Sequence, residues 1–197
     1  MNESRKPHGA GRSTYELIDT ERFFEILNVE KSMVLLDIGA GSGDYTIPLA
    51  EAIGPGGHIY ALDAWEEGLA RVRARASEKH LNNVSTLEAD ANEHIPVADG
   101  TVDICLIANV LHDLLREATG ETVIREMLRV LKPGGRLALL EFKKIGDGPG
   151  PPLHIRLSEE DVRNLLVPFG FHIGSVSDVG KYHYLLIAEK QFERLKV

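Results

Sequence analysis

The chain has 197 residues, of which 43% are hydrophobic and 26% charged, values that are ordinary for one soluble globular domain with a substantial core. Its 22 Lys and Arg against 30 Asp and Glu give a net charge of −8, which argues against nucleic acid as a substrate, because phosphate binding depends on clustered Lys and Arg. The single cysteine excludes a disulfide within the chain. No apolar run reaches the ~18 residues of a membrane span, and residues 1–12 lack the apolar segment of a signal peptide. We therefore expect a cytoplasmic location.

Residues 1–13 contain Pro7, Gly9 and Gly11 among polar and basic residues, so we expect a flexible segment there and a single domain over residues 14–197. Beyond this segment, apolar runs that fit strands alternate with stretches that fit helices. The expected strands cover 33–37, 58–62, 84–87, 102–108 and 136–141, and the expected helices cover 19–27, 44–52, 66–79 and 119–131. This alternation predicts a doubly wound α/β fold, in which a parallel sheet carries helices on both faces.

The pattern changes after Glu141. Residues 146–152 are rich in Gly and Pro and predict a loop, after which Ser158 is expected to cap another helix. Two further strands are expected over 171–177 and 182–189, with only a short connection between them. Because so short a connection forces neighbouring strands to run antiparallel, the sheet should end in an antiparallel hairpin.

The most informative motif lies at the end of the first expected strand. A short apolar run ends in Asp37, and Gly39, Gly41 and Gly43 follow at once. Glycine lets the backbone bend and approach a ligand closely, so this order predicts a buried strand and a tight turn with a ligand against it. Asp63 ends the next strand, twenty residues after Gly43, and an acid at that distance suits the two hydroxyls of a ribose. We therefore expect a nucleoside-bearing small molecule.

Two common nucleotide motifs do not fit this turn. A dinucleotide fingerprint G-x-G-x-x-G would need glycine where Asp44 stands, and the G-K-[ST] of a phosphate-binding loop is absent. The spacing D-x-G-x-G-x-G instead resembles the first motif of the class I S-adenosylmethionine (SAM)-dependent methyltransferases. The helix-ending turn at 128–135 and the C-terminal hairpin are also similar to that family, so the resemblance covers roughly residues 19–190.

The resemblance implies a fold, a methyl donor and a set of binding residues. It implies a seven-stranded, mostly parallel sheet in the order 3-2-1-4-5-7-6 with an antiparallel last strand, and SAM as the cofactor, with S-adenosyl-L-homocysteine (SAH) as its product. The residues expected to bind SAM are Asp37, Gly39, Ala40, Gly41, Gly43, Asp63, Ala64, Asp90, Ala91 and Asn109. They follow the expected strands, and ligands of open α/β sheets bind at the carboxyl ends of strands.

The methyl acceptor should lie near residues that follow the fourth and fifth strands. His112 and Asp113 are the candidate catalytic residues, because a histidine with an ordinary pKa near ~6.5 can remove or position a proton. The alternative is a histidine that packs against the cofactor or caps a helix. Further candidates are Glu141, Lys143, Lys144, His154 and Arg156, whereas Tyr182 and His183 are interpreted as sheet residues. The eight histidines show no metal-ligand spacing with cysteine or carboxylate, so we expect no metal.

The expected function is transfer of a methyl group from SAM to a small-molecule acceptor by in-line displacement. We expect the N-terminal segment and the segments 111–119 and 143–157 to cover the site. An acceptor that is already anionic needs no general base. The chain also resembles the methyltransferases of ubiquinone and menaquinone synthesis, but it is shorter, so their substrate is not extended to it. Open alternatives are a SAM-binding protein without catalysis, a nicotinamide-dependent oxidoreductase, and methylation of a quinone-type or macromolecular acceptor.

Overall fold

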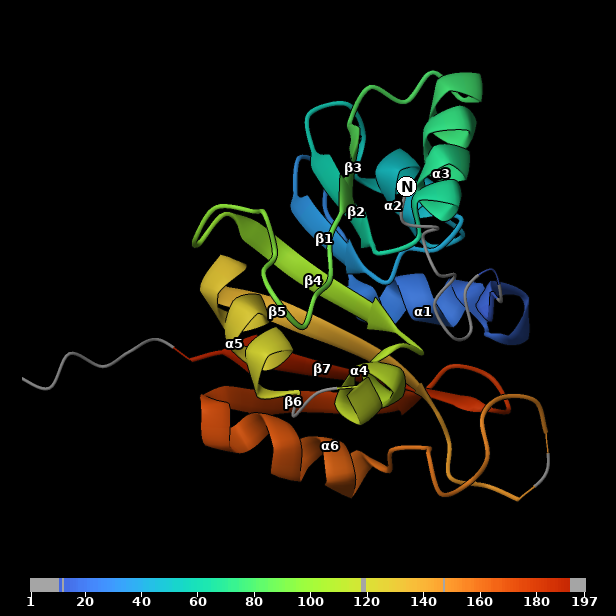
Figure 1. The fold of residues 1–197 in the computed structure, drawn as a ribbon, viewed down its shortest axis with the longest axis vertical. Helices are drawn as coiled ribbons and strands as arrows, with labels where there is room; N and C mark the ends of the chain where they lie inside the picture. Colours follow the sequence, from blue (N-terminus) through green and yellow to red (C-terminus); the bar gives the residue numbers. More distant parts are fainter. Residues whose placement is uncertain (1–10, 12, 118–119, 147, 192–197) are drawn as a thin grey trace, which may run out of the picture.

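A single sheet organises the part of the chain that the computed structural model describes, namely residues 11, 13–117, 120–146 and 148–191. Its strands are β1 (Val34–Ile38), β2 (His58–Asp63), β3 (Val84–Glu88), β4 (Val102–Ala108), β5 (Leu131–Phe142), β6 (Phe171–Asp178) and β7 (His183–Lys190). The order is β3-β2-β1-β4-β5-β7-β6, with β1 to β5 parallel and β7 antiparallel to both of its neighbours (Figure 1). The predicted strand order and the antiparallel last strand are confirmed.

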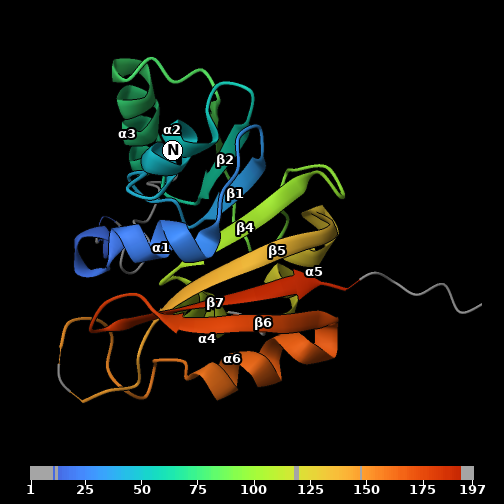
Figure 2. The same cartoon turned by 180° about the vertical axis from the view of Figure 1, so that it is seen from behind.

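Helices cover both faces of the sheet, as the doubly wound prediction requires. Three helices lie on one face, namely α1 (Thr20–Leu27), α2 (Thr46–Ile53) and α3 (Glu66–Glu78). The other face carries α4 (Leu111–Glu117), α5 (Glu121–Val130) and α6 (Glu159–Leu166), as Figures 1 and 2 show together. Successive side chains of β1 divide between the two cores, since Leu35 belongs to the cluster that includes residues of α1 and α2, and Leu36 to the one that includes residues of α5 and α6.

Local hydrogen bonds explain where two helices begin. The Asp19 carboxylate accepts the backbone N–H of Arg22 at 2.9 Å and caps α1. At the start of α6, the Ser158 side chain accepts the N–H of Asp161 at 3.1 Å, and the Asp161 carboxylate accepts the N–H of Ser158 at 2.8 Å. This reciprocal capping box confirms the cap that the sequence predicts at Ser158.

The structure differs from the predicted elements at two places. No helix was predicted directly after β4, but residues 111–117 form α4, because Leu111 and Leu114 are spaced i, i+3 and are buried against the core. Strand β5 begins at Leu131 instead of 136, and its register against β4 shifts between Val102 and Ile104. The Lys-Pro-Gly-Gly sequence is therefore accommodated by an irregularity in the ladder.

Most of the expected flexible segment, residues 1–10 and 12, lies outside the described residues, as do 192–197 of the expected domain. Strand order reverses between β1 and β4, where helices leave the sheet on opposite faces. The carboxyl ends of these strands, the 143–156 loop and the start of α1 meet on the same side of the molecule (Figure 1). None of the described helices is both long and apolar enough to cross a membrane.

Candidate active site

Three glycines in the left-handed backbone region build the turn that follows β1. Their φ angles are +74° for Gly39, +53° for Gly41 and +81° for Gly43, a range that other residues rarely adopt. The N–H groups of Gly39 and Ala40 both donate to the carbonyl of Leu62, at 2.8 and 3.0 Å, which ties the turn to the end of β2. A Cβ added to Gly41 would meet no atom within 4 Å, so the backbone is bare on the side that lines a cavity.

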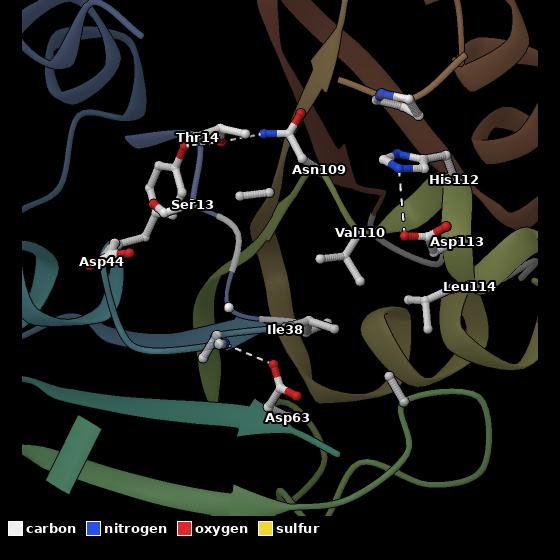
Figure 3. A pocket seen from close by; sticks show the side chains of 18 of the residues that line it. Ser13, Thr14, Ile38, Asp44, Asp63, Asn109, Val110, His112, Asp113 and Leu114 are labelled. Carbon is white, nitrogen blue, oxygen red and sulfur yellow. Dashed lines mark hydrogen bonds and ion pairs between the residues drawn. The ribbon is translucent and has the colours of Figure 1, made fainter. Parts of the chain in front are cut away.

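Asp63 lies at the edge of the same cavity and is held by backbone donors. Its Oδ2 accepts the N–H of Gly41 at 2.7 Å (Figure 3). Its Oδ1 accepts the N–H of Trp65 at 2.8 Å. Burial raises the pKa of this carboxyl, although these backbone hydrogen bonds lower it in part. The side chain is therefore fixed in orientation, and each carboxylate oxygen keeps a further acceptor site for a ligand.

Asp37 and Gly43 do not line the cavity, unlike the other predicted site residues. The Asp37 side chain is 2% exposed, and its Oδ2 accepts the hydroxyl of Thr46 at 2.6 Å. Burial raises the pKa of Asp37 to about 7, although the hydrogen bond from Thr46 lowers it in part. A Cβ on Gly43 would lie 2.9 Å from the Val72 side chain, so this glycine allows α3 to pack closely. Both residues support the turn on the side away from the cavity.

The residues after β3 form the next part of the cavity wall. Asp90 and Ala91 both line it, and the Asp90 carboxylate accepts the N–H of Asn92 at 2.8 Å. Ala91 is buried, and its small side chain leaves room beside the cavity. Glu88 is exposed and is not among the lining residues, so of the two acids around Ala89 only Asp90 reaches the site.

Thr14, at the start of the expected domain, contributes to the cavity wall and contacts residues from two elements. Asn109 follows β4 with φ +56°, and its Nδ2 donates to the Thr14 hydroxyl at 2.7 Å. The same hydroxyl lies 2.9 Å from the Tyr45 hydroxyl, within hydrogen-bond distance. Ser13 and Leu17 join Thr14 in lining the cavity, as the expected cover requires. The amide oxygen of Asn109 is buried without a hydrogen-bond partner among the described residues, which leaves an acceptor available to a ligand.

His112 lines the cavity from the first turn of α4 and contacts a buried carboxylate of β5. Its Nδ1 lies 3.0 Å from each carboxylate oxygen of Glu141, and its Nε2 lies 3.7 Å from Asp113 Oδ2 (Figure 3 shows the latter pair). Burial lowers the pKa of His112, and the positive charge of Arg116 lowers it further. The hydrogen bond and charge of Glu141, with the charge of Asp113, raise the pKa by more. The net result is a raised pKa.

The loop after β5 forms the remaining wall, and Arg156 holds it in shape. The Arg156 side chain is 4% exposed, and its guanidinium donates to backbone carbonyls of the loop at 2.8 to 3.1 Å. These carbonyls belong to Lys143, Ile145, Pro149 and Pro151. The guanidinium carbon also lies 5.4 Å from the centre of the Phe142 ring, which lines the cavity. Arg156 was expected near the pocket mouth, but it lies beneath the loop as a structural support.

The two candidate lysines are engaged elsewhere and do not line the cavity. Lys143 forms an ion pair with Asp178 at 2.8 Å, and Lys144 forms one with Asp161 at 2.8 Å. Both pairs fasten the beginning of the loop to neighbouring elements, the first to β6 and the second to α6.

His154 and Tyr182 do not line the cavity either. His183 is a sheet residue, as expected: it is fully buried, and its ring centre lies 4.2 Å from that of Phe142. Burial, with the charges of Arg156 and Lys143, lowers the pKa of His183 to about 4. The ring is therefore neutral near pH 7, and it packs against Phe142 without lining the cavity itself.

All these walls enclose one continuous cavity of about 760 Å³. Small-molecule sites usually measure about 300–1,000 Å³, so this volume lies within the usual range for a ligand site. Ten of the twelve predicted site residues line it, namely Gly39, Ala40, Gly41, Asp63, Ala64, Asp90, Ala91, Asn109, His112 and Asp113. The nucleoside-type cradle and the histidine thus belong to the same site. Within the described ranges, no three His, Cys, Asp or Glu side chains are grouped to hold a metal ion.

Comparison with known proteins identifies the family. A family described as a methyltransferase domain matches residues 35–135, about half of the chain. The crystal structure of a SAM-dependent methyltransferase from Aquifex aeolicus superposes with a TM-score of 0.82 and 32% identity, over 90% of this chain and 93% of that one. The chain belongs to the SAM-dependent methyltransferases. The family resemblance drawn from the D-x-G-x-G-x-G spacing is thereby confirmed.

Two curated relatives of this methyltransferase have names that specify an acceptor. The demethylmenaquinone methyltransferase of Geobacillus sp. (strain WCH70) is 38% identical over 115 residues, which cover 58% of this chain and 47% of the relative. A ubiquinone/menaquinone biosynthesis C-methyltransferase of Ectopseudomonas mendocina (strain ymp) is 35% identical over 162 residues, which cover 82% of this chain and 59% of the relative. The chain thus spans about half the length of the curated relatives it matches.

Sequence reasoning missed the roles of three residues in this site. Glu141 was a candidate on the acceptor side without a defined partner, Phe142 was not singled out, and Thr14 was part of an expected cover without a defined partner. A contact between His112 and Glu141 spans 29 positions and depends on α4, for which the sequence carried only a weak periodic signal. The position of Glu141 at the carboxyl end of a central strand is the one signal that pointed to the site.

Proposed function

We propose that this chain transfers the methyl group of SAM to a small planar acceptor of the quinol or phenol type. One observation carries the proposal: the bare glycine turn and His112 line the same cavity, so a donor and an acceptor can meet there. The names of the curated relatives support a quinone-type acceptor. The single domain, the cytoplasmic location and the small-molecule substrate stay predictions.

The donor half of the cavity fits an adenosyl group with an amino acid tail. We expect Asp63 to accept hydrogen bonds from the ribose hydroxyls, and Asp90 with Ala91 to face the adenine ring. The open side of Gly41 leaves space for close approach of the ligand, with Gly39, Ala40 and Ala64 beside it. The unpartnered amide oxygen of Asn109 is suited to accept a hydrogen bond from the donor's ammonium group.

The chemistry places modest demands on the protein. SAM supplies a methyl group that its sulfonium already activates, so the residues mainly have to align donor and acceptor, with the reacting atoms on the order of 3–3.5 Å apart. His112 and Asp113 are the proposed catalytic residues. His112 can take the proton of a hydroxyl or an acidic carbon, and Asp113 lies beside its Nε2.

The acceptor half is largely apolar, which fits an aromatic ring. Its lining includes Phe142, Pro151, Pro152 and Ile155. Apolar walls with a few polar groups are the usual composition of sites for planar organic ligands. A protein or nucleic acid acceptor would have to present its reacting group through this cavity, which the Thr14 contacts and the proline loop enclose.

Calorimetry with SAH and methyl transfer from radiolabelled SAM test the proposal. The acceptor panel contains 1,4-dihydroxynaphthalene, simple phenols, a thiol and an amine. We expect the unchanged chain to bind SAH and to transfer methyl groups to the hydroxylated rings. Asp63→Ala should lose SAH affinity at least tenfold, because it removes the carboxylate that is expected to accept hydrogen bonds from the ribose hydroxyls. The control Glu160→Ala changes an exposed acid on α6 and should match the unchanged chain.

Other outcomes select among the alternatives. Tight SAH binding without transfer to any acceptor would favour a binding protein without catalysis. Tight NAD binding without SAH binding would overturn the assignment of the donor cradle.

A further inference from the structure

Glu141 is a buried acid whose surroundings are unusual. Its side chain is fully buried at the end of β5, and within the described residues no lysine or arginine forms an ion pair with it. Burying a carboxylate is costly unless hydrogen bonds compensate. Its compensation comes from His112 Nδ1 at 3.0 Å and from two longer contacts at 3.3 Å, with the N–H groups of His112 and Phe142. The acid is therefore directed at one side chain, the candidate base.

This contact fixes the orientation and the tautomer of the imidazole. Both oxygens of Glu141 lie 3.0 Å from Nδ1, and an ionised carboxylate can only accept, so this geometry favours the tautomer that carries its proton on Nδ1. In the neutral ring the lone pair then resides on Nε2. That atom lies 3.7 Å from Asp113 Oδ2, too far for a hydrogen bond, on the side where Asp113 also lines the cavity (Figure 3).

We propose that Glu141 is a positioning residue that holds His112 with its Nε2 lone pair toward the acceptor. This inference rests on the proposed function. In the step, Nε2 takes the proton of an acceptor hydroxyl, and the oxygen forms a bond to the methyl carbon. The carbon–sulfur bond breaks with its electron pair left on sulfur, which becomes the neutral thioether of SAH. The imidazolium formed is stabilised by the Glu141 carboxylate and later loses its proton to solvent.

The charges around the ring define what a pH profile would report. Glu141 from β5 and Asp113 from α4 both favour the imidazolium, and Arg116 of α4 opposes it. The neutral form of the ring, which is the base, is populated above its pKa. Activity that depends on this base therefore rises with pH, and removal of the Glu141 charge should move that rise to lower pH.

The variant Glu141→Gln tests the inference, because glutamine keeps the shape and loses the charge. We expect kcat with 1,4-dihydroxynaphthalene to fall about 10- to 100-fold, which is less than the roughly 10²–10⁴-fold that general base catalysis contributes, because His112 itself remains. SAH affinity should stay within twofold, and the rising limb of kcat against pH should move to lower pH. Glu141→Asp should recover part of the activity, and His112→Gln should lose the limb altogether.

Nitrogen NMR of His112, assigned with His112→Gln and recorded with SAH bound, gives a readout that needs no turnover. We expect the Nδ1–H tautomer in the unchanged chain and a mixture with the Nε2–H tautomer in Glu141→Gln. An unchanged tautomer, or an unchanged kcat and pH profile with only a lower melting temperature, would overturn the inference and leave methyl transfer intact. Absence of transfer by the unchanged chain to every acceptor would instead refute the proposed function, together with this catalytic role.

Discussion

Single residues of the glycine turn have different roles despite a shared backbone conformation. A Cβ on Gly39 would lie 2.6 Å from a methyl group of Val110, whereas one on Gly41 would meet nothing within 4 Å. Both positions have φ in the left-handed range. Gly39 is therefore required for packing against the segment that follows β4, and Gly41 leaves open space at the wall of the cavity.

The variant Gly41→Ala should lose SAH affinity much more than it loses stability. Left-handed backbone costs alanine about 1–2 kcal/mol, and its methyl group would point into the donor space. Gly100→Ala is a matched control, since φ is +62°, a Cβ meets nothing within 4 Å and the residue does not line the cavity. We expect similar falls in melting temperature, and at least a tenfold loss of SAH affinity in Gly41→Ala alone. Equal affinities would show that the ligand does not approach Gly41.

Asp37 should make the stability of the fold depend on pH. Burial raises the pKa of this acid to about 7 from an ordinary value of 3.8, so the folded state favours its neutral form. The corresponding stabilisation is complete below about pH 4 and is lost as the pH rises to about 7. Asp37→Asn, which is neutral throughout, should therefore raise the free energy of unfolding at pH 8 by on the order of 2–4 kcal/mol, and by less at pH 5.

Urea denaturation at both pH values measures this difference. Glu160→Gln removes one acidic charge from an exposed site and should change stability little at either pH. A gain of equal size at pH 5 and pH 8 would contradict a raised pKa for Asp37.

At the scale of elements, the acceptor half of the cavity depends on a loop with little regular structure. The 143–156 loop is held from inside by the Arg156 guanidinium and at its start by the Lys143 and Lys144 ion pairs. The planar guanidinium group holds its N–H donors in a fixed geometry and donates to four carbonyls at once. A lysine ammonium cannot reproduce that arrangement. The shape of the acceptor wall is therefore set by one buried side chain.

Replacing Arg156 by lysine should weaken acceptor binding selectively. We expect KM for 1,4-dihydroxynaphthalene to rise about tenfold, because loop ordering must then accompany binding, while SAH affinity stays within twofold. The exposed Arg163 of α6 offers the control Arg163→Lys, which should leave both quantities unchanged. An unaltered KM in Arg156→Lys would mean that the loop does not shape the acceptor site.

For the whole molecule, the strand order was predictable and the pairing of side chains across elements was not. The glycine motif, the alternation of strands and helices, and the C-terminal hairpin each constrain topology locally, so they could be read along the chain. The same motif suggested that Asp37 faces the ligand, yet packing of α2 turns it toward Thr46. Likewise, the Gly and Pro content of the loop predicted its existence, but only the tertiary structure shows that Arg156 lies beneath it.

The cavity lies where the strand order reverses, between β1 and β4, which is the general position of ligand sites in open α/β sheets. Residues from the two sides of this reversal therefore face each other across it. Asp63 and the glycine turn come from one side, and His112 and Phe142 come from the other. The topology alone thus brings a donor cradle to a reactive side chain.

Thr14 ties the two sides of this crevice together through Asn109 and Tyr45. With a net worth of about 1 kcal/mol for each hydrogen bond, the fastened arrangement would outnumber the released one roughly thirtyfold. A ligand that enters or leaves the cavity past Thr14 therefore does so from the released minority, so the hydroxyl of a single threonine sets how often this side of the crevice is open.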